Sequence, residues 1–259
     1  MPALSGKWVL VTGATAGLGF AVAESLAGAG ANVVVHDLAA PGDAAERLMA
    51  RFGVTAISIA ADLSQRAAIE TMMGDLLARL DGIDILVNNA VVRHFASVED
   101  FSPDHWEQAL AVNLSAPFHL TRLALPAMKR RGFGRIINLG SIYSTRAVPE
   151  RIDYVTTKTA IVGMTRAIAI ETAQTNITCN ALCPGTLPTP AIQSRIAAAA
   201  ARDGRPVEEV TRDFLAVRQP SGRFIATEGV GALAVFLCTE AARDITGAAL
   251  PVDGGWAIA

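Results

Sequence analysis

The sequence has little cysteine, and its histidines are scattered. Only three cysteines occur in 259 residues: Cys179, Cys183 and Cys238. An odd and sparse set cannot build a disulfide framework, and no pair has the two-residue spacing of a zinc knuckle. We therefore expect three buried, unpaired thiols in a reducing compartment. The four histidines also lack metal-ligand spacing, so no metal site is expected. Of these histidines, His94 is expected to line a ligand pocket.

The sequence also lacks a strong charge of either sign and any long apolar run. The formal net charge is −2 and the pI is near 6.1, which gives no bulk attraction to nucleic acid or to an anionic membrane. No uncharged apolar run reaches the roughly 18 residues that a membrane span needs. The first residues show no basic region followed by an apolar core, so no signal peptide is expected. These absences predict a cytoplasmic protein without membrane or nucleic-acid partners.

Apolar segments rich in β-branched residues alternate with segments of helical periodicity. The predicted strands cover residues 7–12, 32–35, 54–59, 83–87, 135–139, 177–182 and 248–252, and the predicted helices lie near 18–29, 42–52, 64–80, 103–130, 152–174 and 227–240. Strands that alternate with helices form crossovers and a parallel sheet, and continuously apolar strands are covered on both faces. We expect an α/β fold with a doubly wound, seven-stranded parallel sheet of the Rossmann type. No linker divides the chain, so residues 1–259 are expected to form a single domain.

Residues 188–222 break this alternation. An alanine run at 197–201, a turn at Asp203-Gly204 and an apolar stretch at 207–217 predict two small helices, the first starting at Arg195 and the second ending at Arg218. An open α/β sheet binds its ligand beyond the carboxyl ends of its strands. We expect these helices to form a substrate lid, and the alternative is a structural excursion without that role.

A glycine-rich turn follows the first predicted strand and begins the first helix. Gly13 permits a sharp turn, Gly17 lets a pyrophosphate approach the backbone, and Gly19 lets the helix pack closely. Asp37 ends the second strand, 20 residues after Gly17, where a carboxylate accepts hydrogen bonds from an adenosine ribose. Many glycine turns are only structural, but this carboxylate favours a dinucleotide. It would also repel a 2′-phosphate, so the expected cofactor is NAD rather than NADP.

Tyr154 and Lys158 lie four residues apart on the predicted helix 152–174, so they share one helical face. Oxidation of a secondary alcohol needs a base for the hydroxyl proton, and a free phenol, with a pKa near 10, is a weak base at neutral pH. An ammonium about 5 Å away stabilises a phenolate by about 3 kcal/mol at an effective dielectric of about 20. The pair therefore predicts Tyr154 as general base in oxidation and general acid in reduction, assisted by Lys158. A lone Tyr-x-x-x-Lys pair is more often a surface accident, so its position matters.

These residues and their spacing resemble the short-chain dehydrogenase/reductase family over essentially the whole chain. The glycines follow the pattern Gly-x-x-x-Gly-x-Gly, Asn88-Asn89-Ala90 follows the fourth strand, and Ser141 stands 13 residues before Tyr154. The resemblance implies that Ser141 donates to the substrate oxygen and that Lys158 also holds the nicotinamide ribose. It implies that Asn113 supports a water chain to the lysine, with a helix-kinking amide as the alternative. Val91 departs from the pattern, because the family usually has glycine there.

The resemblance further implies a set of cofactor contacts and a homotetramer built on helices 103–130 and 152–174. The implied cofactor contacts are Gly13, Thr15, Gly17, Leu18, Gly19, Asp37, Asp62, Leu63, Asn89, Ala90, Tyr154, Lys158, Pro184, Gly185 and Leu187.

Arginines near the catalytic motif indicate the substrate class. Guanidinium groups bind carboxylates through paired hydrogen bonds, and the expected substrate contacts are Arg93, Tyr143, Arg151, Arg195 and Arg218. Each arginine alone is also typical of a solvated surface. Segments 183–196, 213–219 and 253–256 resemble the members of the family that act on 3-hydroxybutyrate. A small hydroxy acid of that kind is therefore the expected substrate, and Trp256 is expected to close the pocket or a subunit contact.

Other functions stay open within the same family. A sugar-acid or polyol dehydrogenase is compatible with the same motifs. A 3-oxoacyl-carrier-protein reductase would normally use NADP and a basic docking patch, which Asp37 and the acidic pI disfavour. A nucleotide-binding regulator without catalysis would have lost the Ser/Tyr/Lys set, which is present.

Overall fold

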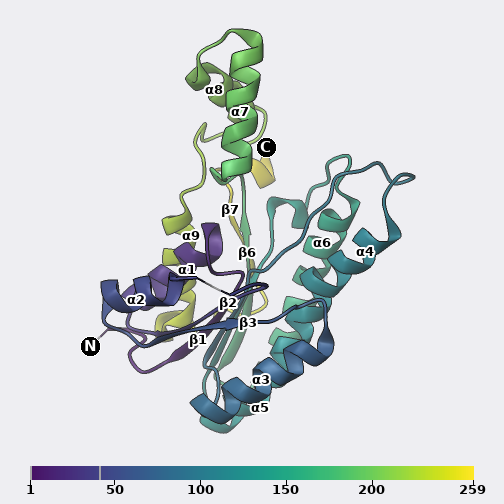
Figure 1. Ribbon diagram of the computed structural model, residues 1–259. Helices are drawn as coiled ribbons and strands as arrows, with labels where there is room; N and C mark the ends of the chain where they lie inside the picture. The colour runs from purple at the N-terminus through teal and green to yellow at the C-terminus, as the bar shows by residue number, and fades with distance from the viewer. Residues whose placement is uncertain (1, 41) are drawn as a thin grey trace.

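The predicted strands pair into one parallel sheet. In the computed structural model, which describes residues 2–40 and 42–259, the seven strands lie in the order β3-β2-β1-β4-β5-β6-β7 (Figure 1). The strands are β1 (Trp8–Thr12), β2 (Asn32–Asp37), β3 (Ala56–Ala60), β4 (Ile85–Asn88), β5 (Gly134–Leu139), β6 (Ile177–Pro184) and β7 (Ala249–Val252). This confirms the doubly wound, seven-stranded fold that the sequence predicts.

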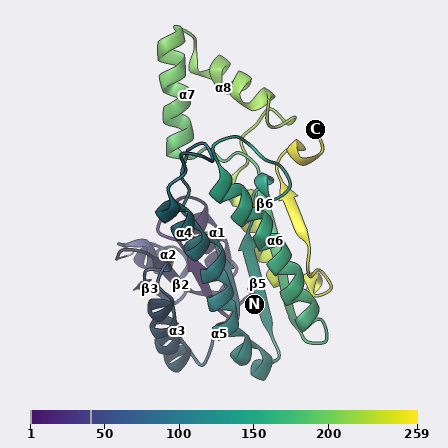
Figure 2. The same cartoon turned by 90° about the vertical axis from the view of Figure 1, so that its right-hand side faces the viewer.

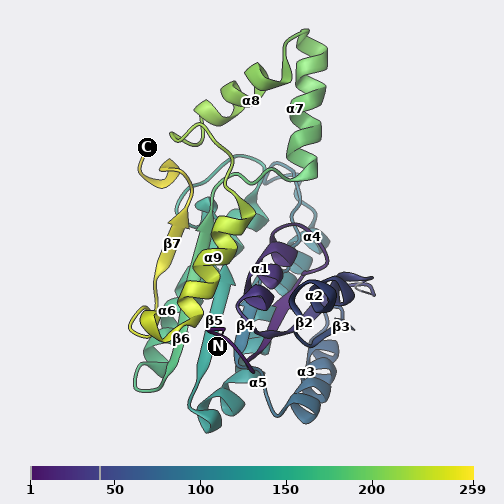
Figure 3. The same cartoon turned by 90° about the vertical axis from the view of Figure 1, so that its left-hand side faces the viewer.

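Helices cover both faces of the sheet. One layer consists of α1 (Gly17–Gly28), α2 (Ala44–Phe52) and α9 (Thr227–Cys238) (Figure 3). The other consists of α3 (Arg66–Leu80), α4 (Pro103–Leu110), α5 (Ala116–Arg131) and α6 (Ile152–Thr172) (Figure 2). Within the described part of the chain, no helix combines the length and apolar character that crossing a bilayer requires.

Alternate side chains of each central strand pack against the helices on opposite faces of the sheet. Val9 and Val11 of β1 pack in the cluster that includes α1 and α9, whereas Leu10 packs in the cluster that includes α3 and α5. Successive strand side chains point to opposite faces, so a strand covered on both sides must be apolar at every position. This explains why the strand signal is a continuous apolar run rather than an alternation.

The strand order reverses at β1, which pairs with β2 on one side and β4 on the other. The crossovers from these strands diverge at that point, leaving a crevice beyond their carboxyl ends. The glycine turn after β1 and the segment after β4 both begin there, so the topology brings these two sequence-distant motifs together.

Two predicted elements differ in detail. The stretch near 103–130 is interrupted by a π-helical turn at Ala111–Ser115. Pro117 has no N–H to donate to the carbonyl of Asn113, four residues earlier, so a regular α-helical ladder cannot continue there. The first inserted helix, α7 (Pro190–Asp203), begins five residues before Arg195, and α8 (Val207–Ala216) ends before Arg218. The earlier start follows from Thr189, whose side chain caps the helix, and from Pro190 in its first turn.

Candidate active site

A cavity of about 1000 Å³ opens at the carboxyl ends of the central strands. All predicted cofactor contacts line it: Gly13, Thr15, Gly17, Leu18, Gly19, Asp37, Asp62, Leu63, Asn89, Ala90, Tyr154, Lys158, Pro184, Gly185 and Leu187. Ser141 and all the predicted substrate contacts, Arg93, Tyr143, Arg151, Arg195 and Arg218, line the same cavity. The fold thus brings together every predicted site residue except Asn113, which does not line the cavity.

The glycine turn has the shape of a dinucleotide site. Gly13 and Gly17 have positive φ angles of 60° and 57°, which residues with a Cβ rarely adopt. A Cβ on Gly17 would meet no atom within 4 Å, so its face toward the cavity is open to a ligand. Helix α1 has no side-chain cap and no acidic residue in its first turn. Its free N–H groups and positive dipole end therefore suit a phosphate.

At the far end of the crevice, Asp37 is held in a fixed position. Its carboxylate accepts hydrogen bonds from the Thr15 hydroxyl and from the backbone N–H of Leu38, the latter at 2.8 Å. Asp62 accepts a 2.9 Å hydrogen bond from the Ser64 N–H and also lines the cavity. The strand end therefore presents an anchored carboxylate where the sequence predicts the adenosine ribose.

Asn89 ties the segment after β4 to the glycine turn. Its side-chain amide donates to the carbonyls of Thr12 and Gly13, both at 2.9 Å, and its backbone N–H donates to the Thr12 hydroxyl. The amide is thus used for structure rather than aimed into the cavity. Val91, where the family usually has glycine, lines the cavity with an exposed side chain.

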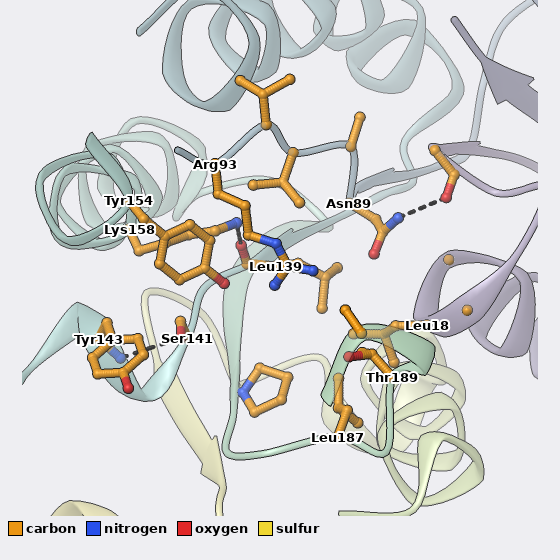
Figure 4. A pocket seen from close by; sticks show the side chains of 18 of the residues that line it. Leu18, Asn89, Arg93, Leu139, Ser141, Tyr143, Tyr154, Lys158, Leu187 and Thr189 are labelled. Atoms are coloured by element: carbon orange, nitrogen blue, oxygen red, sulfur yellow. Dashed lines mark hydrogen bonds between the residues drawn. The ribbon is translucent and has the colours of Figure 1, made fainter. Parts of the chain in front are cut away.

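Tyr154 and Lys158 enter the cavity from the first two turns of α6, and Ser141 enters from the end of β5 (Figure 4). The Lys158 ammonium lies 5.7 Å from the centre of the Tyr154 ring and donates to the Leu139 carbonyl. The Ser141 hydroxyl oxygen accepts from the Tyr143 N–H at 3.2 Å, which leaves its own proton free to donate. The arrangement offers one proton donor, one phenol and one ammonium to the same small volume.

The side chain of Asn113 holds a loop instead of lining the cavity. Its amide donates to the Val92 carbonyl at 2.9 Å and accepts from the Val92 N–H at 2.9 Å. It also donates to the Thr157 hydroxyl at 3.2 Å. Its backbone carbonyl lacks the usual donor because residue 117 is proline. Because the side chain is engaged in these bonds, we expect this backbone carbonyl to hold the water chain that the resemblance implies. That role stays a prediction.

A family model described as "Enoyl-(Acyl carrier protein) reductase" matches residues 13–257. The chain belongs to the short-chain dehydrogenase/reductase family. It is an oxidoreductase of this family, with a site for a nicotinamide cofactor in its Rossmann-like fold.

Relatives within the family match almost the whole chain. A D-beta-hydroxybutyrate dehydrogenase of Cupriavidus necator is 46% identical, with 98% of each chain covered. A second D-beta-hydroxybutyrate dehydrogenase, from Rhizobium meliloti, is 38% identical over 96% of this chain and 98% of the relative. Among solved structures, the L-sorbose reductase of Gluconobacter frateurii, complexed with NADPH and L-sorbose, superposes with a TM-score of 0.94. It is 28% identical, and each chain is covered completely.

In this short-chain dehydrogenase, burial acts strongly on Lys158. The side chain is almost fully buried, and its pKa is lowered from 10.5 to about 8, mainly by this desolvation and to a smaller extent by the Arg93 guanidinium. The Cys183 thiol acts in the opposite direction. A buried ammonium is costly for the fold, as is common for charges kept for function.

Lys158→Met should therefore stabilise the free protein at pH 7, by about 2 kcal/mol. The unfolded lysine has a pKa near 10.5 and the folded one near 8, so the unfolded state binds more protons between these values. The penalty is full below pH 8, and wild-type stability rises with pH through this window. Urea unfolding at pH 7 and pH 10 measures the difference, which should shrink at the higher pH. Lys129→Met, at an exposed lysine, is the control, and a variant less stable than wild type at pH 7 would contradict the argument.

The catalytic half of the cavity is rich in arginine and aromatic rings. The Arg151 guanidinium lies 4.1 Å from the Phe95 ring centre and 4.9 Å from that of Tyr154. Trp256 also lines the cavity and packs edge-on against Tyr143, with ring centres 5.8 Å apart. Phe95 could not be found from the sequence, because a single phenylalanine in a loop carries no periodic or motif signal.

His94, which the sequence suggests as pocket lining, lies behind the pocket instead. Its Nδ1 is 3.1 Å from the Asp153 carboxylate, and its ring stacks on His105 with centres 4.0 Å apart. Asp153 is fully buried and also accepts from the Tyr154 N–H at 2.6 Å. The buried carboxylate draws the imidazole inward. Asp153 was not among the predicted site residues, although its place next to Tyr154 in the sequence was a signal.

Proposed function

We propose that this enzyme oxidises a small 3-hydroxy acid of the 3-hydroxybutyrate kind to its keto acid with NAD, or catalyses the reverse. The observation that carries the proposal is the joining, in one cavity, of the Ser141, Tyr154 and Lys158 side chains with guanidinium groups. The trio suits a secondary alcohol, and guanidinium groups suit a carboxylate. The identity to the Cupriavidus and Rhizobium relatives supports this substrate class.

The side chains divide the chemistry as follows. Tyr154, as phenolate, takes the hydroxyl proton of the substrate, and Ser141 donates a hydrogen bond to the same oxygen. Lys158 stabilises the phenolate by its charge, and its position beside Tyr154 suits it to pass a proton onward through water held at Asn113. When bound, the oxidised nicotinamide supplies an acceptor for the hydride that leaves the carbinol carbon. The alcohol thus loses one proton to the protein and one hydride, and becomes a ketone.

NAD is the proposed cofactor, and Asp37 is the reason. Its carboxylate is fixed by two hydrogen bonds and would face the 2′-position of the adenosine ribose. A phosphate there would meet a negative charge with no basic partner from the glycine turn. The sorbose reductase bound to NADPH makes a direct comparison of the two cofactors necessary.

Wild-type protein should bind NAD at least about tenfold more tightly than NADP, and Asp37→Asn should reduce that ratio by a similar factor. Fluorescence titration with each cofactor gives both dissociation constants. Asp43→Asn removes a nearby exposed acid outside the cavity and should keep the wild-type ratio. Tighter binding of NADP by the wild type would refute the cofactor proposal.

The substrate class is tested by a panel. Purified protein with NAD is offered 3-hydroxybutyrate, other hydroxy acids, sugar acids and polyols, and the rise of reduced nicotinamide absorbance is followed. We expect hydroxy acids to have the highest kcat/KM. Turnover confined to polyols or neutral sugars would reject the proposal and favour the second candidate.

A sugar-acid or polyol dehydrogenase is that second candidate. The similarity to L-sorbose reductase over the full chain favours it. A 3-oxoacyl-carrier-protein reductase fits less well, because Asp37 disfavours NADP.

Assembly and location are part of the proposal. A homotetramer would cover the exposed apolar side chains of α5 and α6, among them Phe118 and Ile170. A cytoplasmic location suits three cysteines that are all buried and free.

A further inference from the structure

Four arginines line the catalytic half of the cavity without an anionic partner. Arg93, Arg151, Arg195 and Arg218 all line it, yet among the described residues none of them forms an ion pair with a carboxylate. The only acidic side chain lining this half, in the described chain, is Glu150, which is exposed and also unpaired. The cavity therefore has more positive charge than its own residues neutralise.

Arg93 and Arg151 form the first pair, beside Tyr154. Burial lowers the pKa of Arg151, and the Arg93 charge lowers it further. Arg151 stacks on the Phe95 and Tyr154 rings, and its buried Nε has no hydrogen-bond partner. Figure 4 shows the Arg93 side chain extending from its loop into the cavity, toward which Tyr154 also points. The pair offers free N–H donors next to the catalytic phenol.

Arg195 and Arg218 form the second pair, carried by the lid segment. Both pack on the Phe214 ring, with guanidinium carbons 5.2 Å and 3.9 Å from its centre. Arg218 also donates to the Phe214 carbonyl at 2.7 Å. Tyr143 is near both pairs: its ring centre lies 6.2 Å from that of Tyr154, which Arg151 also contacts, and it borders a small hollow together with Arg218.

The backbone on both sides of Arg93 is anchored. Val92 is held by two hydrogen bonds to the Asn113 side chain: its N–H donates to the amide oxygen, and its carbonyl accepts from the amide nitrogen. His94 is held by the buried Asp153 carboxylate, which accepts from both its backbone N–H and its ring. With its neighbours fixed, the backbone of Arg93 is held at the cavity, so only its side-chain rotamers are left to be ordered when a ligand binds.

A single carboxylate can engage one pair through forked hydrogen bonds. The other pair would then keep two like charges near each other without a counter-charge, and a second carboxylate would relieve that repulsion. We propose that the preferred substrate is a hydroxy dicarboxylate, with one carboxylate bound by Arg93 and Arg151, the other by Arg195 and Arg218, and the hydroxyl carbon between them at Tyr154. This inference rests on the proposed function and narrows its substrate class.

Three matched substrates test it: 3-hydroxybutyrate, 3-hydroxyglutarate and the monomethyl ester of 3-hydroxyglutarate. They share the hydroxyl carbon and one carboxylate, and only the second compound carries two charges. We expect kcat/KM for 3-hydroxyglutarate to exceed that of the other two by about tenfold or more. Oxidation of 3-hydroxybutyrate or the monoester as fast as the dicarboxylate overturns the inference but keeps the proposed function. If none of the three compounds is oxidised while neutral sugars are turned over, both the inference and the proposed function are wrong.

Arg93→Gln tests the anchored arginine itself. The ratio of kcat/KM for 3-hydroxyglutarate to that for 3-hydroxybutyrate should fall by about tenfold. Arg212→Gln removes an exposed arginine of α8 that does not line the cavity and should keep the wild-type ratio. NAD titration of each variant without substrate distinguishes a role of Arg93 in cofactor binding from a role in substrate binding. An Arg93→Gln variant with an unchanged ratio, or with weakened NAD binding as its only defect, counts against the inference.

Discussion

Tyr154→Phe should lower kcat for alcohol oxidation by about 10³-fold or more while NAD affinity stays within about twofold. The phenol is the group in the cavity placed to take the hydroxyl proton, since Lys158 donates to the Leu139 carbonyl and Ser141 is engaged by the Tyr143 N–H. Phenylalanine keeps the ring, and with it the contacts to Arg151 and Lys158 at 4.9 Å and 5.7 Å. Packing should therefore persist, and the loss should fall on the chemical step. Stopped-flow turnover and equilibrium cofactor titration measure the two quantities separately.

The matched comparison is Tyr143→Phe, since the chain has only these two tyrosines. Tyr143 borders the arginine pairs, so its loss should act mainly on KM and leave kcat within about tenfold. If Tyr154→Phe retained near-normal turnover, or if both variants lost kcat equally, the assignment of the general base would be wrong.

Motifs with strict local geometry could be predicted from the sequence. The turn at Gly13 and Gly17 requires positive φ, and two side chains four residues apart on a helix must share a face. Tyr154, Lys158 and the glycine turn therefore appear in the structure where the spacing puts them. The alternation of strands and helices also predicts a doubly wound parallel sheet, because right-handed crossovers leave few topologies.

Contacts between distant loops could not be predicted in this way. The Asn113 clamp on Val92 depends on a π-helical turn and on a loop twenty residues earlier, and neither has a local signature. His94 was misplaced because nothing in its own neighbourhood indicates that the buried Asp153 lies beside it. The arginines could be suspected singly, but their pairing arises only when the segments after β4, β5 and β6 meet over the sheet.

Gly19→Ala should destabilise the protein by about 3 kcal/mol. A Cβ at this position would lie 2.1 Å from the Gly13 carbonyl oxygen and 2.4 Å from the Asn89 Nδ2. The first atom belongs to the backbone of the glycine turn, and the second belongs to an amide already bonded to two carbonyls. Neither can retreat without opening the junction between the segments after β1 and β4. A melting temperature lowered by roughly 6–12 °C would correspond to this loss.

The same displacement should weaken NAD binding by at least about tenfold, because it moves the N–H groups that are proposed to hold the pyrophosphate. Gly74→Ala is the control: this glycine lies within α3, is exposed, and a Cβ there meets no atom within 4 Å. Alanine at such a helical position should stabilise by up to about 1 kcal/mol and leave NAD affinity unchanged. Comparing the two variants by thermal unfolding and cofactor titration therefore distinguishes two effects. One is the general effect of replacing a helical glycine by alanine, and the other is the steric clash of a Cβ at position 19 with the glycine turn. A Gly19→Ala protein that melts like Gly74→Ala and binds NAD normally would show that the third glycine is not needed for close packing.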